Sequence, residues 1–179
     1  MTINVEELRN APIAVLGGGA VGKTCAADCA LAGQEVRICD LDPFFESTLG
    51  NVDKTGVTIM IEPLNTFVDH PGYYLTSSAE AFDMIREVDN PFVKVVYDMY
   101  HQQIMEGNII PSVTKNLDLI AHLHAAGHPG RHELQNGELN YAVVFDALDK
   151  AGYAGACGLE YFPVLPSMES LETFKRLYL

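Results

Sequence analysis

The feature that most constrains the fold of this chain is a regular alternation between short apolar runs and amphipathic segments. The runs are rich in β-branched residues and fit strands, and the segments between them have helical periodicity. The predicted strands are Ile13–Leu16, Glu35–Cys39, Val57–Ile61, Val93–Tyr97, Leu119–His124 and Ala156–Leu159. The predicted helices are Val21–Ala32, Ser77–Val88, Pro111–Leu117 and Tyr141–Ala151. This order predicts an α/β fold of about six parallel βα units with right-handed crossovers.

Length and charge limit the architecture and the partners. The chain has 179 residues, whereas a complete eight-unit (β/α) barrel takes about 250. Its 11 basic and 24 acidic residues give a net charge of −13, which disfavours nucleic acid and anionic membranes because both need cationic surface. The N-terminus lacks a secretory pattern, and no run reaches the about 18 apolar residues of a membrane span. We therefore expect a cytoplasmic protein that acts on a small molecule.

A glycine-rich loop follows the first predicted strand. Gly17, Gly19 and Gly22 form G-x-G-x-x-G between a strand and a helix, and Asp40 lies 18 residues after Gly22. Such glycines let backbone N–H groups approach a pyrophosphate, and the carboxylate can accept ribose hydroxyls, so these four residues are candidates for binding NAD(P). The same stretch spells G-x-x-x-x-G-K-T through Lys23–Thr24. A phosphate loop or a glycine turn without a ligand is therefore an alternative.

Four of the predicted strands end in a side chain that can bind a metal ion. These residues are Glu62, Asp98, His124 and Glu160, which are 36, 26 and 36 positions apart. The carboxyl ends of parallel strands gather at one edge, so four consecutive units can aim these side chains at one point. Three carboxylates and an imidazole suit Mn²⁺, Mg²⁺ or Co²⁺, and a cation between them offsets their repulsion. A single carboxylate at a strand end, by contrast, is often only solvated or caps a helix.

Six stretches of the second part of the chain carry a specific resemblance. They are IEPLNT, PGYYLTSSAEAFDMI, VVYDMYHQQIMEGN, HLHAAGHPGRHE, NGELNY and GYAGACGLEYFP. Through them, residues 58–179 resemble the C-terminal half of a hydroxypyruvate isomerase, in the xylose-isomerase-like barrel group of sugar isomerases and epimerases. The resemblance implies half of a TIM barrel, a divalent metal held by the four strand-end residues, and contacts of His101 and Arg131 with substrate oxygens.

The chemistry expected from this resemblance is aldose–ketose isomerisation or epimerisation of small sugars or hydroxy-keto acids. A metal ion polarises the substrate carbonyl, and a carboxylate removes the neighbouring C–H proton to give a cis-enediolate. Glu62 and Glu160 are the candidate acid/base pair. Arg131 would hold a substrate oxygen or carboxylate. His101 is either a substrate donor or a brace for the site.

The first part of the chain carries a different resemblance, through APIAVLGGGAVGKTCAADCALAGQEVRICDLD. Residues 12–57 resemble the NAD-binding βαβ unit that opens opine (octopine/nopaline-type) dehydrogenases. We therefore expect a Rossmann-like unit at residues 1–57 and a half barrel at residues 58–179. A half barrel leaves one sheet edge uncovered, through which two chains can form a homodimer. The alternative functions are an NAD(P)-binding oxidoreductase fragment and a non-catalytic fusion.

Overall fold

The computed structural model describes residues 13–16, 36–39 and 57–179. It has two compact units, one formed by Met1–Met60 with Asn90–Val93 and the other by Ile61–Asp89 with Lys94–Leu179. In the first unit, strands β1 (Ile13–Leu16) and β2 (Val36–Cys39) pair in parallel. The helix predicted at Val21–Ala32 lies outside the described residues.

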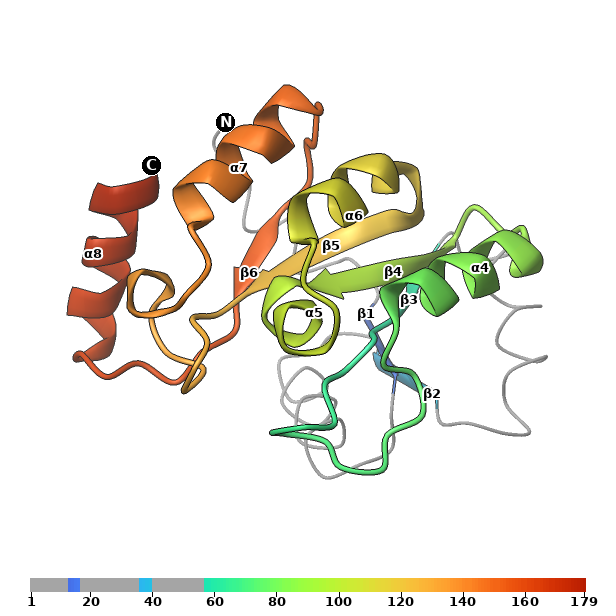
Figure 1. The fold of residues 1–179 in the computed structure, drawn as a ribbon. Helices are drawn as coiled ribbons and strands as arrows, with labels where there is room; N and C mark the ends of the chain where they lie inside the picture. Colours follow the sequence, from blue (N-terminus) through green and yellow to red (C-terminus); the bar gives the residue numbers. More distant parts are fainter. Residues whose placement is uncertain (1–12, 17–35, 40–56) are drawn as a thin grey trace. The chain divides into compact units, whose positions relative to one another are not determined.

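A four-stranded sheet runs in the order β3, β4, β5, β6 (Figure 1). Its strands are β3 (Ile59–Ile61), β4 (Val93–Asp98), β5 (Ile120–Ala125) and β6 (Cys157–Leu159). The pairs β4–β5 and β5–β6 are parallel, as the alternation with helices predicts. The register shifts once, because Val95 pairs with Ile120 but Val96 pairs with His122. Ala121 is thus an extra residue in β5, a β-bulge that the sequence did not predict.

The described helices are α4 (Ser78–Val88), α5 (Met99–Met105), α6 (Ile109–Lys115), α7 (Tyr141–Lys150) and α8 (Ser167–Tyr178), with 3₁₀ turns at Leu117–Leu119 and Leu134–Asn136. Two of them begin at a residue whose side chain caps the first turn. The Ser77 side chain accepts the N–H of Glu80 at 3.4 Å, and the Asn140 side chain accepts the N–H of Val143 at 3.4 Å. The Glu80 carboxylate accepts a hydrogen bond from the hydroxyl of Tyr74. It is therefore directed away from the backbone N–H of Ser77, which the glutamate of a capping box would bind.

Helices α5 and α8 were not predicted, for different reasons. Helix α5 starts directly at the end of β4, with Asp98 serving both as the last residue of the strand and as the cap of the helix. No turn residue separates the two elements, so the apolar run and the helix look continuous in the sequence. Helix α8 carries Met168, Leu171 and Phe174 at helical spacing, so its signal was present in the sequence and was overlooked.

The core lies between the sheet and the helices that cover one of its faces (Figure 1). Val95, Tyr97 and Leu123 are fully buried in the central strands. The ring of Phe82 in α4 stacks on that of Tyr97, with centroids 6.1 Å apart. The hydroxyl of Tyr141 in α7 donates to the carbonyl of Ala126, just beyond β5, at 2.8 Å. These contacts fix the helices on the sheet and leave its carboxyl edge free for polar side chains.

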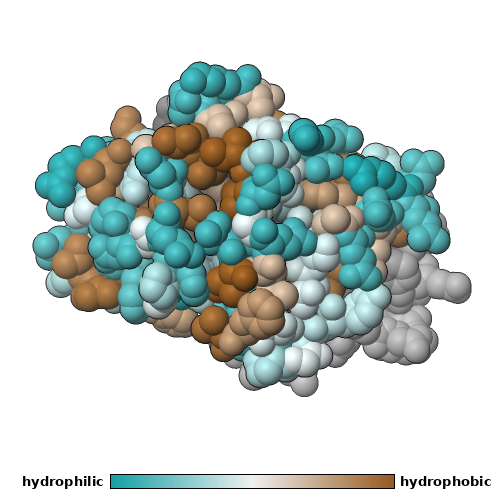
Figure 2. All heavy atoms as spheres, viewed as in Figure 1, coloured by the Kyte–Doolittle hydropathy of each residue, from teal (hydrophilic) through white to brown (hydrophobic). Residues whose placement is uncertain are grey.

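Polar side chains cover much of the helical face, and apolar ones gather between α6 and α7 (Figure 2). An open apolar groove of about 330 Å³ lies there, and residues from both helices line it, among them Ile109, Ile110, Pro111, Val143 and Val144. None of the helices that the structure describes is long and apolar enough to cross a membrane.

We expect the Leu123→Ala variant to lose about 2 to 5 kcal/mol of unfolding free energy, because truncation of a fully buried leucine leaves a cavity. Urea unfolding followed by far-UV circular dichroism measures the loss. The control is Leu179→Ala at a side chain that is 91% exposed, which should unfold like the wild type. Equal stability of both variants would contradict the core described above.

Candidate metal centre

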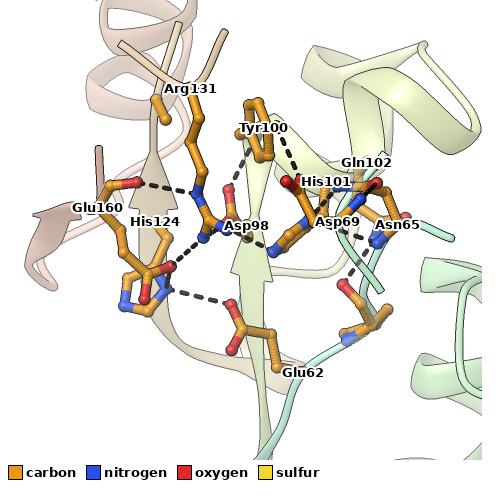
Figure 3. Close-up of polar contacts among 12 residues, drawn as sticks. Glu62, Asn65, Asp69, Asp98, Tyr100, His101, Gln102, His124, Arg131 and Glu160 are labelled. Atoms are coloured by element: carbon orange, nitrogen blue, oxygen red, sulfur yellow. Dashed lines mark hydrogen bonds and ion pairs between the residues drawn. The ribbon is translucent and has the colours of Figure 1, made fainter. Parts of the chain in front are cut away.

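Four ionisable side chains lie together at the carboxyl ends of β3, β4, β5 and β6 (Figure 3). Each offers one possible ligand atom, and these atoms lie within 4.8 Å of one another. The residues are Glu62, Asp98, His124 and Glu160. The structure therefore brings together the four residues selected from the strand ends, although they are spread over almost one hundred positions of the chain (Glu62 to Glu160).

The strand register explains why these side chains converge. Asp98, the last residue of β4, lies opposite His124 in β5, and His124 lies opposite Gly158 in β6. Glu160 follows β6, and its N–H donates to the carbonyl of Ala125 at 3.1 Å. A Cβ atom on Gly158 would lie 2.9 Å from Cδ2 of His124. Glycine is therefore needed at this position for the imidazole to keep its place.

His124 is the centre of the hydrogen bonding in this cluster. Its Nδ1 lies 3.1 Å from Oε1 of Glu62 and 3.3 Å from Oε2 of Glu160. Burial alone would lower the pKa of His124, but hydrogen bonds with both glutamates raise it to about 10. The hydrogen bond with His124 in turn lowers the pKa of Glu160. Without a metal ion, the protonated imidazole thus holds the two glutamates together.

Asp98 is the most deeply buried member, with a side chain that is fully shielded from solvent. Its Oδ1 accepts the N–H of Tyr100 at 2.8 Å and caps α5. Its Oδ2 has no hydrogen-bond partner within the described residues, although Nε2 of His101 lies 3.5 Å away and Nη2 of Arg131 3.8 Å away. Burial, followed by the negative charge of Glu62, raises the pKa of Asp98 to about 7.

The unpartnered Oδ2 of Asp98 provides a test of whether these residues fit a cation. A buried carboxylate oxygen without a hydrogen bond is costly, and a metal ion bound to it removes that cost. Ligand atoms about 2.1 Å from one ion lie about 3 to 4.2 Å apart, a spacing compatible with the 4.8 Å limit of the cluster. The donor set of three carboxylates and one imidazole, with an unsatisfied oxygen facing the others, therefore fits a divalent cation.

Arg131 brings a positive charge to the same cluster. Its Nη2 lies 2.8 Å from Oε2 of Glu160, and its Nε donates to the backbone carbonyl of that residue at 3.2 Å. The guanidinium carbon lies 5.0 Å from the ring centroid of Tyr100, a cation–π contact. These contacts leave Nη1 without a hydrogen-bond partner in the described part of the chain. Arg131 can therefore donate to another oxygen without giving up Glu160.

His101 lies behind Asp98 and is 1% exposed. Its Nδ1 accepts the backbone N–H of Asn65 at 3.3 Å and lies 2.6 Å from Nδ2 of the same residue. Burial lowers the pKa of His101 to about 3, so the ring is neutral. Because Nδ1 accepts the N–H of Asn65, the proton is assigned to Nε2, which faces Asp98. This placement favours the brace over the substrate donor among the two roles expected from the sequence.

Three further residues complete the surroundings of the cluster and were missed by the sequence reasoning. Asn65 is fully buried, and Asp69 accepts both its side-chain amide at 2.7 Å and the hydroxyl of Tyr100 at 2.8 Å (Figure 3). These hydrogen bonds connect Asn65, Asp69 and Tyr100, and the ring of Tyr100 lies beneath the guanidinium of Arg131. Asn65 lies three residues after Glu62 and Tyr100 two after Asp98, so nearness to a predicted ligand was the signal available. The predicted cofactor residues Gly17, Gly19, Gly22 and Asp40 lie outside the described residues.

Comparisons with known proteins give a consistent picture. A family model described as Xylose isomerase-like TIM barrel matches residues 44–177. A 2-oxo-tetronate isomerase from Cupriavidus necator is 43% identical over 108 residues, covering 60% of this chain and 41% of that protein. The hydroxypyruvate isomerase of Escherichia coli is 39% identical over 110 residues, covering 62% and 42%. The chain therefore spans less than half the length of these curated relatives.

A solved structure agrees with the sequence relatives. The crystal structure of an AP endonuclease, family 2, from Brucella melitensis superposes with a TM-score of 0.70 and 31% identity, covering 89% of this chain and 67% of that one. The family match, these relatives and this structure give no support to the opine dehydrogenase resemblance. The family match begins at residue 44, and the domain boundary between residues 57 and 58 stays a prediction.

We expect Asp98→Asn to remove a pH dependence from the stability of the metal-free chain. The folded-state pKa of Asp98 is about 7, above its ordinary 3.8, so between these values the folded chain keeps a proton that the unfolded chain has lost. This contribution is fully present below about pH 4 and is lost as the pH rises to about 7, at about 1.4 kcal/mol per pH unit. Asparagine can still cap α5 through its oxygen.

Urea unfolding in EDTA at several pH values measures this effect. The unfolding free energy of Asp98→Asn minus that of the wild type should rise from about pH 5 to about pH 7 and then level off. The matched control is Asp83→Asn, since Asp83 is exposed and, among the described residues, pairs only with Arg86 in α4. A difference between Asp98→Asn and the wild type that stays constant over this range would contradict the raised pKa.

Proposed function

The chain belongs to the xylose isomerase-like TIM barrel family, and from that premise we propose that it is a divalent-metal-dependent isomerase or epimerase of small sugars or hydroxy-keto acids. The observation that carries the proposal is the convergence of Glu62, Asp98, His124 and Glu160 within 4.8 Å. The isomerase relatives named above support the reaction type. Because they match over less than half of their length, the activity of the whole protein is part of the proposal.

The four clustered residues are our proposed ligands for Mn²⁺, Mg²⁺ or Co²⁺. When bound, such a cation supplies Lewis acidity that polarises a substrate carbonyl and acidifies the adjacent C–H bond. Asp98 is suited to anchoring the ion, because its buried Oδ2 has no other partner in the part of the chain that the structure describes. Nε2 of His101 lies 3.5 Å behind this carboxylate, and Asn65 fixes the ring of His101 through Nδ1, so His101 is suited to position Asp98 as outer groups do at metal sites.

Glu62 and Glu160 are the proposed acid/base pair. Their side chains are 28% and 51% exposed, whereas Asp98 is fully buried, so they are the two carboxylates of the cluster that a substrate can reach. One takes the proton from the substrate carbon next to the carbonyl, and the cis-enediolate receives a proton from a carboxylic acid in return. Delivery of the proton to the neighbouring carbon gives an isomer. Delivery of the proton to the opposite face of the original carbon gives an epimer.

Arg131 is the proposed substrate-binding residue. Its guanidinium is fixed on one side by Glu160 and below by the ring of Tyr100, so Nη1 stays oriented without the loss of side-chain freedom that a mobile arginine would incur. A carbonyl, hydroxyl or carboxylate oxygen of the substrate is a suitable acceptor for it. The negative charge that develops on an enediolate oxygen strengthens this hydrogen bond during the reaction.

The remaining predictions have narrower support. NAD(P) binding at Gly17, Gly19, Gly22 and Asp40, a Rossmann-like unit and about six βα units rest on the sequence pattern alone. The homodimer through a sheet edge rests on the expected half barrel. An oxidoreductase fragment and a non-catalytic fusion are therefore the alternatives that the first experiment below separates from the proposed isomerase.

Ligand-dependent melting identifies which site is formed. We expect Mn²⁺ to raise the melting temperature, because an ion present at one hundred times its dissociation constant stabilises the folded state by about 2.7 kcal/mol. Glu160→Gln should abolish most of this shift, and Glu138→Gln, at an exposed glutamate that contacts Gln103, should retain it. A shift with NAD⁺ and none with Mn²⁺ would favour the oxidoreductase fragment, and no shift with either would favour the non-catalytic fusion.

Solvent deuterium exchange tests the chemistry directly. In D₂O with Mn²⁺, we expect the chain to exchange the C3 hydrogens of hydroxypyruvate, or the α-hydrogens of a small ketose. The carboxylic acid that holds the abstracted proton exchanges it with solvent and then returns a deuteron to the enediolate carbon. Glu160→Gln should slow the exchange by about 10² or more, and EDTA should stop it. Proton NMR follows the loss of signal, and a chain that binds Mn²⁺ yet exchanges none of these substrates would refute the proposed reaction.

A further inference from the structure

Three consecutive residues of the loop after β5 bind the segment that follows β6. The carbonyl of Arg131 accepts the N–H of Phe162 at 2.8 Å, and Nδ1 of His132 donates to the carbonyl of Phe162 at 2.7 Å. The carboxylate of Glu133 accepts the N–H of Val164 at 3.0 Å and that of Leu165 at 3.0 Å. We call these contacts, between residues 131–133 and residues 162–165, the loop clamp.

Glu133 is the buried member of the loop clamp, with 1% exposure. Its second oxygen also accepts the N–H of Val164, at 3.2 Å, and the side-chain amide of Asn136, at 3.3 Å. Burial alone would raise the pKa of Glu133, but hydrogen bonds from the backbone of Leu165 and from other donors hold it at about 2. Glu133 is therefore ionised throughout the neutral range and has no proton to exchange, so its role is to position other groups.

The segment held by the loop clamp begins directly after Glu160. Strand β6 has only three residues, and the N–H of Glu160 makes the last backbone hydrogen bond to β5, at the carbonyl of Ala125. Beyond that point the path of the chain is set by the loop clamp and by a hydrogen bond between the hydroxyls of Tyr161 and Ser170. The Glu160 side chain is half exposed and would move with the backbone that follows it.

The loop clamp also holds the partner of Glu160. Arg131, two residues before Glu133, contacts both the side chain and the backbone carbonyl of Glu160. Its φ of 53° lies in the left-handed region, which is costly for a residue with a Cβ and persists only where neighbouring contacts fix the backbone. The hydrogen bond from the N–H of Phe162 to the carbonyl of Arg131 and the bridge between Gly127 and His132 are such contacts.

We propose that Glu133 is a positioning residue that, by binding the N–H groups of Val164 and Leu165, holds Glu160 beside His124 and Arg131. The inference rests on the proposed function, since it concerns the placement of a proposed metal ligand and acid/base group. Glu133 itself touches neither the cluster nor a substrate. It acts through the backbone of residues 161–165, which a carboxylate with two acceptor oxygens can bind at two successive N–H groups.

A double-mutant cycle for Mn²⁺ affinity tests this role. Titration calorimetry with Mn²⁺ alone is carried out on the wild-type chain, Glu133→Gln, Glu160→Ala and the double variant. We expect Glu133→Gln to weaken binding about tenfold, the lower range for an outer positioning group. In the Glu160→Ala background the same change should alter affinity less than about twofold, because the ligand that Glu133 positions is absent. Glu138→Gln, in the same loop, is the control and should bind like the wild type.

Amide hydrogen exchange of the metal-free chain gives a readout that does not depend on the metal. The N–H groups of Val164 and Leu165 should be protected in the wild type and in Glu138→Gln, and should exchange at least about tenfold faster in Glu133→Gln. Glu133→Asp serves as a second variant, whose shorter carboxylate should restore part of the protection and part of the affinity. Circular dichroism confirms that each variant is folded at the temperature used.

The outcomes separate the two proposals. A tenfold loss in the wild-type background that vanishes in Glu160→Ala supports the positioning role. An equal loss in both backgrounds, or unchanged protection of the two amides in Glu133→Gln, overturns it and leaves the metal site intact. A wild-type chain that binds no Mn²⁺ overturns the proposed function and this inference together.

Discussion

Repulsion among three carboxylates at one edge of a parallel sheet is the constraint on which the rest of this site depends. In the metal-free chain the protonated ring of His124 lies between Glu62 and Glu160, and Arg131 pairs with Glu160. Together these cations offset most of the negative charge, but neither forms a hydrogen bond with the buried oxygen of Asp98. One buried oxygen is thus left without a partner, and a divalent ion bound there would satisfy it and would take the place of the proton on the imidazole.

Two buried carboxylates of this protein show how local donors decide what an acidic group does. Asp98 keeps one oxygen without a partner, and its pKa is raised to about 7. Glu133 is buried to a similar extent, but hydrogen bonds from backbone N–H groups hold its pKa at about 2. The first can give up its proton to a cation if one binds, and the second is ionised throughout the neutral range and binds two backbone N–H groups of a loop. Burial alone does not distinguish these two roles, and the number of donors does.

Much of the fold could be predicted from the sequence because its signals are local. The apolar runs predicted the strands, and the helical periodicity of the segments between them predicted α4 and α7. The four members of the cluster could be selected because each lies at the end of a strand and parallel strands end at a common edge. Helix α5 escaped prediction because Asp98 is both its cap and the last residue of β4. The burial of His101 and the loop clamp depend on contacts between distant segments, which a pattern along the chain does not carry.

The bulge at Ala121 has a consequence for how this strand can vary. With the extra residue, His124 lies opposite Asp98. If β5 kept all its residues but lost the bulge, the pairing of Val95 with Ile120 would continue in step and place Leu123 opposite Asp98, so an aliphatic side chain would occupy the place of the imidazole. Deletion of Ala121 itself would instead leave His122 opposite Val96 and His124 opposite Asp98, as in the present sheet. Homologues without the bulge can therefore keep the imidazole in this place only with a strand that is also one residue shorter between the positions of Ile120 and His124.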